Sequence, residues 1–241
     1  MSNPVRRYLP ISPSVTPSPK VDNDTANTRR IRGVVFDMDG TLVSPMTEYL
    51  REMRIRLNVP PGEDTLLYVS RLPEPEKLAA EETIMAIETR ALEEMRLQPG
   101  LAELLQFLSH HKIPRAILTR NNRQSVDHML QQVMTPHHNG QPQVFTFDPI
   151  VTRDFQPIKP EPAPLYHIAA CWGVRPEELV MVGDHRDDLD CGRRAGAVAV
   201  LLKDKVNTHF MPLADICLES LDQLISYLEK GFTLPEATAS N

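Results

Sequence analysis

The sequence predicts an α/β fold in which a Rossmann-like parallel sheet is covered by helices on both faces. Short apolar runs of strand length alternate along the chain with segments whose apolar residues recur at helical spacing. Parallel strands that are buried on both faces have such continuous apolar runs, and helices supply the crossovers between them. The expected strands are Gly33–Phe36, Arg115–Leu118, 149–152, 179–182, 198–201 and 215–218.

Each of these strands is justified by its own apolar run, and the segments between them favour helices. Leucines and other apolar residues recur three and four positions apart at 101–108, 126–133, 165–172 and 221–228. In parallel sheets of this kind, ligands bind beyond the carboxyl ends of the strands. The strand ends are therefore the places where we look for chemistry.

The segment from 44 to 98 breaks the alternation, because it shows only helical periodicity. Ile84, Ile87 and Ala91 lie on one stripe, which indicates a small apolar core. A structureless connection of this length would be unusual inside a compact domain. We therefore expect a helical cap at 44–98, inserted after the first strand of a core that comprises 31–43 and 99–230.

The two ends of the chain are expected to be flexible. Residues 1–30 are rich in Pro, Ser, Thr, Asn and Asp, a composition that buries too little apolar surface to order itself. This predicts a disordered tail at 1–30, and we expect a flexible C-terminus at 231–241.

The composition argues against several classes of partner and favours the cytoplasm. With a net charge of −6, the chain has no global basic field to recruit nucleic acid or an acidic membrane. No apolar run reaches the roughly 18 residues that span a bilayer. Three scattered cysteines suit a reducing compartment. Arg6 and Arg7 with nearby serines leave a mitochondrial address open, which Asp22 and Asp24 disfavour.

The most informative feature is the pair Asp37 and Asp39, which follows the strand Gly33–Phe36 directly. Two neighbouring buried acids are costly unless a cation or a protonation step uses them. A strand-end turn, where Asp, Gly and Thr are common for local reasons, is the alternative.

Two cationic or hydroxyl groups follow further along. Thr119 ends the second strand just before a helix, where a hydroxyl and free backbone N–H groups can hold an anion. Plain helix capping by Asn121 or Asn122 is the alternative. Lys159 lies in a proline-rich segment that restricts its backbone, so its ammonium can be positioned on a phosphate oxygen. An incidental lysine in a proline-rich connector is the alternative there.

A second acidic site follows the strand at 179–182. Asp184 lies where this buried run leaves the sheet, and Asp188 returns to the same side if a helical turn begins there. Together with Asp37 they would supply oxygen ligands to a small hard cation, for which Mg²⁺ is the natural choice.

In this order, the four segments resemble the haloacid dehalogenase-type phosphohydrolase superfamily, over about residues 33–228. The motifs are Asp37-Met38-Asp39-Gly40-Thr41, Thr119, Lys159-Pro160, and Gly183-Asp184 with Asp188. The helical insert resembles the type I cap of compact relatives of phosphoglycolate phosphatase. The dehalogenase branch lacks an acid at the second position, so the pair Asp37 and Asp39 disfavours dehalogenation.

The resemblance implies a role for each motif residue. Asp37 would be the nucleophile, and Asp39 the general acid and base whose main-chain carbonyl also binds Mg²⁺. Asp184 would be a metal ligand and Asp188 a ligand or its support, while Thr119 and Lys159 would hold the phosphoryl group. Candidate substrate contacts are Arg120, Asn121 and, in the cap, Tyr49, Arg51, Arg54 and Arg56.

The expected function is that of a Mg²⁺-dependent phosphatase that hydrolyses a small phosphate monoester through an aspartyl-phosphate. Its partner would be a small phosphorylated metabolite, with no nucleic acid and no membrane. A phosphomutase of the same fold and a catalytically silent binding protein are the alternatives. Neither the particular monoester nor the oligomeric state is indicated by the sequence.

Overall fold

A six-stranded parallel sheet forms the centre of the computed structural model, which describes residues 5–11, 28–45, 47–133, 137–138, 141–142 and 145–235. Its strand order is β10–β9–β8–β3–β4–β7, so the strand that precedes Asp37 lies between two neighbours. The α/β class is confirmed, and each expected strand agrees to within one residue at either end. The strands are β3 (Gly33–Phe36), β4 (Arg115–Leu118), β7 (Ile150–Val151), β8 (Leu179–Gly183), β9 (Val198–Leu202) and β10 (Ile216–Leu218).

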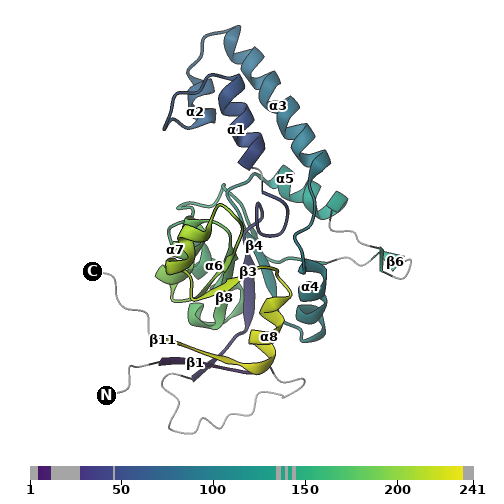
Figure 1. Cartoon of the computed structure of the whole chain (residues 1–241), viewed down its shortest axis with the longest axis vertical. Coiled ribbons are helices and arrows are strands. Elements are labelled where there is room, and N and C mark those ends of the chain that lie inside the picture. Colours follow the sequence, from purple (N-terminus) through teal and green to yellow (C-terminus); the bar gives the residue numbers. More distant parts are fainter. Residues whose placement is uncertain are drawn as a thin grey trace.

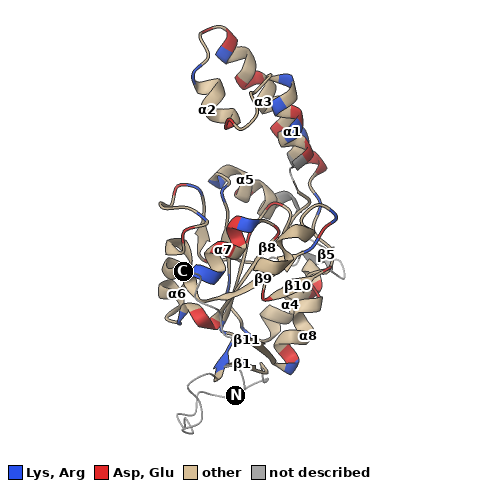
Figure 2. Ribbon diagram, turned by 60° about the vertical axis from the view of Figure 1, so that its left-hand side comes forward, with Lys and Arg blue, Asp and Glu red and all other residues tan. Residues whose placement is uncertain are grey.

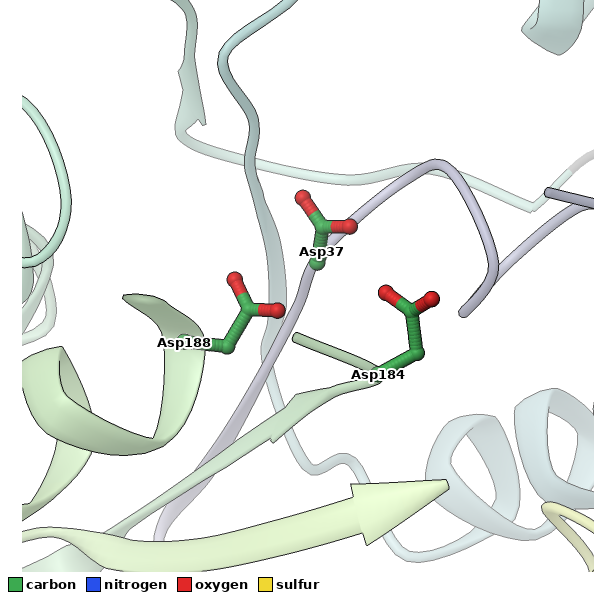
Figure 3. Close-up of side chains that lie close together, drawn as sticks. All are labelled: Asp37, Asp184 and Asp188. Carbon is green, nitrogen blue, oxygen red and sulfur yellow. The ribbon is translucent and has the colours of Figure 1, made fainter. Parts of the chain in front are cut away.

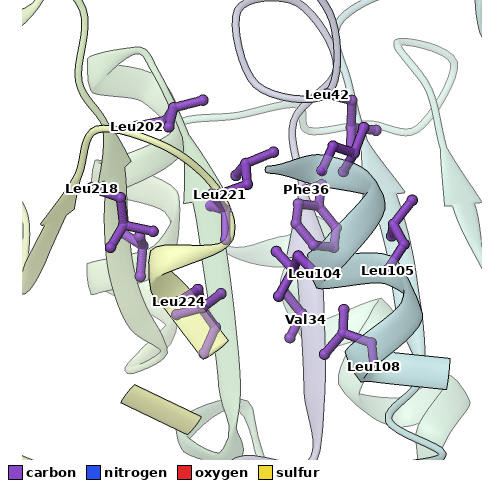
Figure 4. Packing of buried hydrophobic residues seen from close by; sticks show 14 of the residues in the cluster. Val34, Phe36, Leu42, Leu104, Leu105, Leu108, Leu202, Leu218, Leu221 and Leu224 are labelled. Atoms are coloured by element: carbon purple, nitrogen blue, oxygen red, sulfur yellow. The ribbon is translucent and has the colours of Figure 1, made fainter. Parts of the chain in front are cut away.

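Helices cover both faces of this sheet, as Figure 1 shows. The alternation of side chains along β3 explains the two layers. Val34 and Phe36 point to the face covered by α4 and α8, whereas Val35 points to the face covered by α6 and α7. Figure 4 shows the first of these layers. The helices are α4 (Leu101–His110), α5 (Arg123–His128), α6 (Ala163–Trp172), α7 (Arg186–Ala195) and α8 (Gln223–Lys230).

Shorter segments complete the connections between these elements. They are the π-helical turn η1 (Met129–Val133), the 3₁₀ turns η2 (Pro176–Glu178) and η3 (Thr208–Leu213), and the antiparallel pair β5 (His137–His138) and β6 (Gln141–Pro142).

Among the described residues, every helix is too short or too polar to span a bilayer.

Three helices occupy the stretch after the first motif: α1 (Thr47–Arg56), α2 (Thr65–Ser70) and α3 (Glu76–Glu94). They stand beyond the edge of the sheet at which β3 ends (Figure 1), and α1 and α3 contain many charged residues (Figure 2). Five buried residues make their own small core: Met53, Val69, Ala80, Ile84 and Ile87.

Two neighbouring linkers join these helices to the sheet. The Ser44 amide donates to the Arg96 carbonyl at 2.8 Å, and the Gln98 amide donates to the Leu42 carbonyl at 3.0 Å. Val43 and Leu97 form an antiparallel bridge between the linkers. The entering and leaving chains are thus tied to each other where they meet the core.

A second, three-stranded sheet corrects the expectation of flexible ends. β1 (Val5–Leu9) lies between β2 (Thr28–Arg30) and β11 (Phe232–Pro235), although 1–30 and 231–241 were expected to be disordered or flexible. The same expectation for 1–4, 12–27 and 236–241 lies outside the described residues. This sheet lies at the opposite end of the core from α1–α3 (Figure 1). The composition of the tail as a whole hid a short strand with a buried face.

Arg6 and Tyr8 form that buried face. The Arg6 guanidinium donates to the Asp215 carboxylate at 2.7 Å and to the Pro235 carbonyl at 3.2 Å. Asp215 in turn accepts from the Ala199 amide at 2.9 Å, which connects the small sheet to β9. Tyr8 stacks on Phe232 with 4.6 Å between the ring centroids. A buried ion pair and an aromatic stack therefore hold the first strand.

We expect the Arg6→Ala variant to lower the free energy of unfolding by about 3 kcal/mol, because it leaves Asp215 as an uncompensated, largely buried charge. Urea denaturation followed by far-ultraviolet circular dichroism measures this change. Arg7→Ala is the matched control, since Arg7 is exposed, and its effect should stay within about 0.5 kcal/mol. Equal unfolding midpoints for the two variants would contradict a stabilising role for the ion pair between Arg6 and Asp215.

Candidate active site

Three acidic side chains converge at the carboxyl edge of the sheet. Asp37 follows β3, Asp184 follows the neighbouring strand β8, and Asp188 lies in the first turn of α7. Each offers a carboxylate oxygen, and these oxygens lie within 4.8 Å of one another. Figure 3 shows the three carboxylates around a common space. The parallel pairing of β3 and β8 brings the first and last motifs together.

Lys159 joins two of these acids to a third strand. Its ammonium lies 2.6 Å from Asp37 Oδ1, 2.6 Å from Asp188 Oδ1 and 2.8 Å from the Leu118 carbonyl oxygen at the end of β4. Only 3% of Lys159 is exposed. An ammonium has three N–H donors, and here each one has an acceptor.

Burial and charge shift the pKa values of this cluster in a consistent way. Burial alone would lower the pKa of Lys159, but the charges of Asp188 and Asp37 outweigh it and raise that pKa, so the ammonium stays charged. Burial raises the pKa of Asp37, which the charge of Lys159 opposes. Burial, reinforced by the charge of Asp188, raises the pKa of Asp184 to about 7.

Two glycines permit the close approach of the acids. Gly40 has a φ of +75°, and a Cβ atom there would overlap the Asp184 carboxylate. A Cβ atom on Gly183 would likewise overlap Asp188. Larger residues at these positions would push the acidic side chains apart.

The oxygens that remain free suit a small hard cation. With all groups ionised, three carboxylates and one ammonium leave a surplus of negative charge that a divalent ion would neutralise. Among the described residues, none donates a hydrogen bond to Asp37 Oδ2. The Asp184 carboxylate accepts a hydrogen bond from its own backbone N–H and from no other described residue. Asp188 uses Oδ1 for Lys159 and Oδ2 for the His185 amide, at 3.1 Å. Asp184 would thus hold the ion directly, Asp37 would hold it through the second lone pair of Oδ1, which leaves Oδ2 free, and Asp188 would support them.

Thr119 and Asp39 line the same edge. Thr119 is 3% exposed and follows Leu118, whose carbonyl holds Lys159. Its hydroxyl oxygen accepts from the Asn121 amide at 3.1 Å, which leaves the hydroxyl hydrogen free to be donated. The Asp39 carboxylate is not one of the three that lie within 4.8 Å of one another, but its charge contributes to the raised pKa of Asp37. Burial raises the pKa of Asp39 itself, against the hydrogen bond from Asn121.

The two candidate substrate contacts after Thr119 have partners within the chain. Arg120 is exposed and donates to Asp187 at 2.8 Å, in the first turn of α7. Asn121 donates its side-chain amide to Asp39 Oδ2 at 2.5 Å. Neither side chain lies in the three-acid group.

Two residues that sequence reasoning missed secure the backbone of the motifs. Asn207 is 5% exposed and donates to the Asp184 and Leu202 carbonyls, both at 2.9 Å. Gln98 donates to the Gly40 carbonyl at 2.8 Å. The carbonyls of Asp184 and Gly40 are distant in sequence from Asn207 and Gln98, so no local pattern in the sequence signals these two contacts.

We expect Mg²⁺ to stabilise the protein more at about pH 8 than at about pH 5.5. The raised pKa of Asp184 means that its stability contribution is fully present below about pH 4 and is lost as the pH rises through about 7. A cation bound to the ionised form offsets this loss above that pH. Thermal unfolding with Mg²⁺ or a chelator, at both pH values, measures the difference.

Asp184→Asn should abolish most of the Mg²⁺ effect at the higher pH, because the amide carries no charge at either pH. Equal stabilisation by Mg²⁺ at the two pH values, or an unchanged effect in this variant, would refute the assignment of Asp184 as a ligand.

Comparison with known proteins places this geometry in a family. The family model for haloacid dehalogenase-like hydrolases matches residues 31–196. An uncharacterised hydrolase of Saccharomyces cerevisiae is 38% identical over 207 residues, which are 83% of this chain and 92% of the relative. A phosphoglycolate phosphatase of Chromobacterium violaceum is 24% identical over 229 residues, 85% of this chain and 100% of the relative.

The fold is likewise shared with solved structures. The crystal structure of a predicted phosphoglycolate phosphatase from Haemophilus somnus superposes with a TM-score of 0.62 at 18% identity, covering 81% of this chain and 97% of that one. The family match spans the strands β3, β4, β7 and β8 and all four motifs. The chain therefore belongs to the haloacid dehalogenase-like hydrolase family.

Proposed function

We propose that this enzyme, a phosphohydrolase of its family, hydrolyses a small phosphate monoester with Mg²⁺ through an aspartyl-phosphate on Asp37. The observation that carries the proposal is the state of the Asp37 carboxylate. One of its oxygens is held by the buried Lys159, and the other has no donor among the described residues. A fixed carboxylate with one free oxygen at a strand end is suited to attack a bound phosphoryl group.

The chain's own residues account for the proton and charge movements. Asp37 Oδ2 forms a bond to phosphorus while the bond to the leaving oxygen breaks, and Asp39 gives that oxygen its proton. In the second half, a water oxygen attacks phosphorus, the bond to Asp37 breaks, and Asp39 takes a proton from the water. When bound, Mg²⁺ would neutralise phosphoryl oxygens, so that a carboxylate can approach them.

Thr119 and Lys159 would stabilise the phosphoryl group in different ways. The free hydroxyl hydrogen of Thr119 is available for a phosphoryl oxygen. All three N–H groups of Lys159 already have acceptors, so Lys159 acts through its charge unless it releases one of them. Thr119 would therefore bind the phosphoryl group by a hydrogen bond and Lys159 mainly by its charge, although the resemblance implies the same role for both.

We further propose that α1–α3 form a cap over the site and that its inner surface selects the substrate. Four residues of the cap were expected to contact the substrate, and three of them have a partner within the cap itself. Tyr49 donates to Glu94 at 2.7 Å, Arg54 to the Pro60 carbonyl at 2.8 Å, and Arg56 lies 2.8 Å from Glu52. Arg51 has no such partner in the described part of the chain. It is therefore our preferred candidate in the cap for a contact to the substrate.

The alternatives differ in what the enzyme does with its phosphorylated intermediate. A phosphomutase would return the phosphoryl group to a second hydroxyl of a sugar phosphate, whereas the phosphatase passes it to water. Hexose 1-phosphate as substrate, with both isomerised sugar and free phosphate assayed, separates the two. A silent binding protein would release no phosphate from any monoester. We place the activity in a reducing compartment such as the cytoplasm, because all three cysteines are free.

We expect the protein to release phosphate from an aryl phosphate with Mg²⁺ and to stop when the metal is chelated. Asp37→Asn should lower kcat by at least about 1,000-fold, because it removes the nucleophile. Rapid acid quench with a labelled substrate should trap an acid-stable, alkali-labile acyl phosphate on Asp37 of the unchanged protein.

Asp127→Asn is the control, since it makes the same chemical change at an exposed ion pair on α5 and should leave turnover unchanged. An Asp37→Asn variant that keeps full turnover, or turnover that resists chelation, would overturn the proposal.

A further inference from the structure

Asn121 makes a contact that its place in the sequence does not suggest. It lies beyond the end of β4, and its side chain reaches back to the loop after β3. The Nδ2 atom donates to Asp39 Oδ2 at 2.5 Å and lies 3.5 Å from the Met38 sulfur. Both N–H groups of the amide therefore face the loop that carries the two acids.

The backbone of Asn121 is fixed on both sides. Its N–H donates to Thr119 Oγ1 at 3.1 Å, and its carbonyl accepts from the Arg153 amide at 3.1 Å. The side chain is thus presented to Asp39 from a rigid base. In contrast, the neighbouring Asn122 caps α5 by accepting from the Ser125 amide at 2.8 Å and does not contact Asp39.

We propose that Asn121 is a positioning residue that aims the Asp39 carboxyl and leaves its Oδ1 as the oxygen that transfers protons. This deepens the proposed function and rests on it. Since Nδ2 donates to Oδ2, a proton on Oδ2 would meet another N–H, whereas Oδ1 is buried and has no hydrogen-bond partner among the described residues. The acidic proton therefore resides on Oδ1.

The steps of the reaction then involve a single oxygen of Asp39. Oδ1 gives its proton to the leaving oxygen as that oxygen separates from phosphorus and Asp37 bonds to it. Oδ1 later accepts the proton of the attacking water, as the bond between Asp37 and phosphorus breaks. Asn121 itself exchanges no proton and only holds the other oxygen in place.

This role differs from the substrate contact expected from the sequence. With both N–H groups directed at Asp39 and Met38, the group of Asn121 that remains is its amide oxygen. That oxygen is an acceptor and would repel phosphate oxygens, which are acceptors too. Asn121 thus acts on the substrate through Asp39.

A series of para-substituted phenyl phosphates tests this, because the substrates keep nearly the same size while the need to protonate the leaving phenol changes. The kcat/KM of each substrate is measured for the unchanged protein, Asn121→Ala, the matched control Asn122→Ala, Asp39→Asn, and the double variant Asp39→Asn with Asn121→Ala. Thermal unfolding of each variant monitors folding.

Asn121→Ala should lower kcat/KM about 10- to 100-fold for the methoxy substrate, which needs its phenol protonated, and less than about 3-fold for the nitro substrate, which does not. Asn122→Ala should shift all substrates equally and slightly. In the Asp39→Asn background, Asn121→Ala should change little further, because its effect passes through Asp39.

An equal loss on all substrates, or the same loss in both backgrounds, would overturn the proposal and favour a direct or merely structural role for Asn121. Such a result would leave the proposed function intact, since the unchanged protein still turns over. Failure of the proposed function appears separately, as an unchanged protein that releases no phosphate from any substrate of the series.

Discussion

The buried ammonium of Lys159 is the interaction on which the rest of the site depends. It holds acids from two different elements, Asp37 after β3 and Asp188 in α7, and anchors both to the end of β4. Without it, the burial of three neighbouring carboxylates would strongly favour their neutral forms, which could neither attack phosphorus nor bind a cation. This positive charge opposes the rise that burial causes in the pKa of Asp37, and it fixes the geometry of the two acids that it contacts.

The sheet determines which groups this charge can reach. Because β3 is flanked by β4 and β8, the ends of these three strands lie next to each other. Each end contributes one kind of chemistry: acids after β3 and β8, and a hydroxyl after β4. Gly40 and Gly183 then allow the side chains to meet at distances that a Cβ atom would forbid. The parallel topology and two small residues together create the crowding that Lys159 makes tolerable.

Much of this arrangement could be predicted from the sequence, and the limits have physical causes. Apolar runs and strand-end acids are local signals, so the core strands and the convergence of Asp37, Asp184 and Asp188 could be expected. Asn207 and Gln98 escaped notice because they bind backbone carbonyls that only folding brings near. The ion pair between Arg120 and Asp187 could not be predicted either, because its partners lie 67 residues apart in the chain. Strand β1 was missed because its buried face consists of Arg6 and Tyr8, whose partners lie far along the chain.

The position of β1 has a consequence for the order of events during synthesis. Arg6 bonds to a carbonyl 229 residues later, so β11 leaves the ribosome long after β1 does. β1 can pair with β2 early in synthesis. Its other edge and the charge of Arg6 stay exposed to solvent until β11 and Asp215 have been synthesised. The small sheet can therefore be completed only after β11 has been synthesised, and so can the part of the apolar core to which Tyr8 and Leu234 belong.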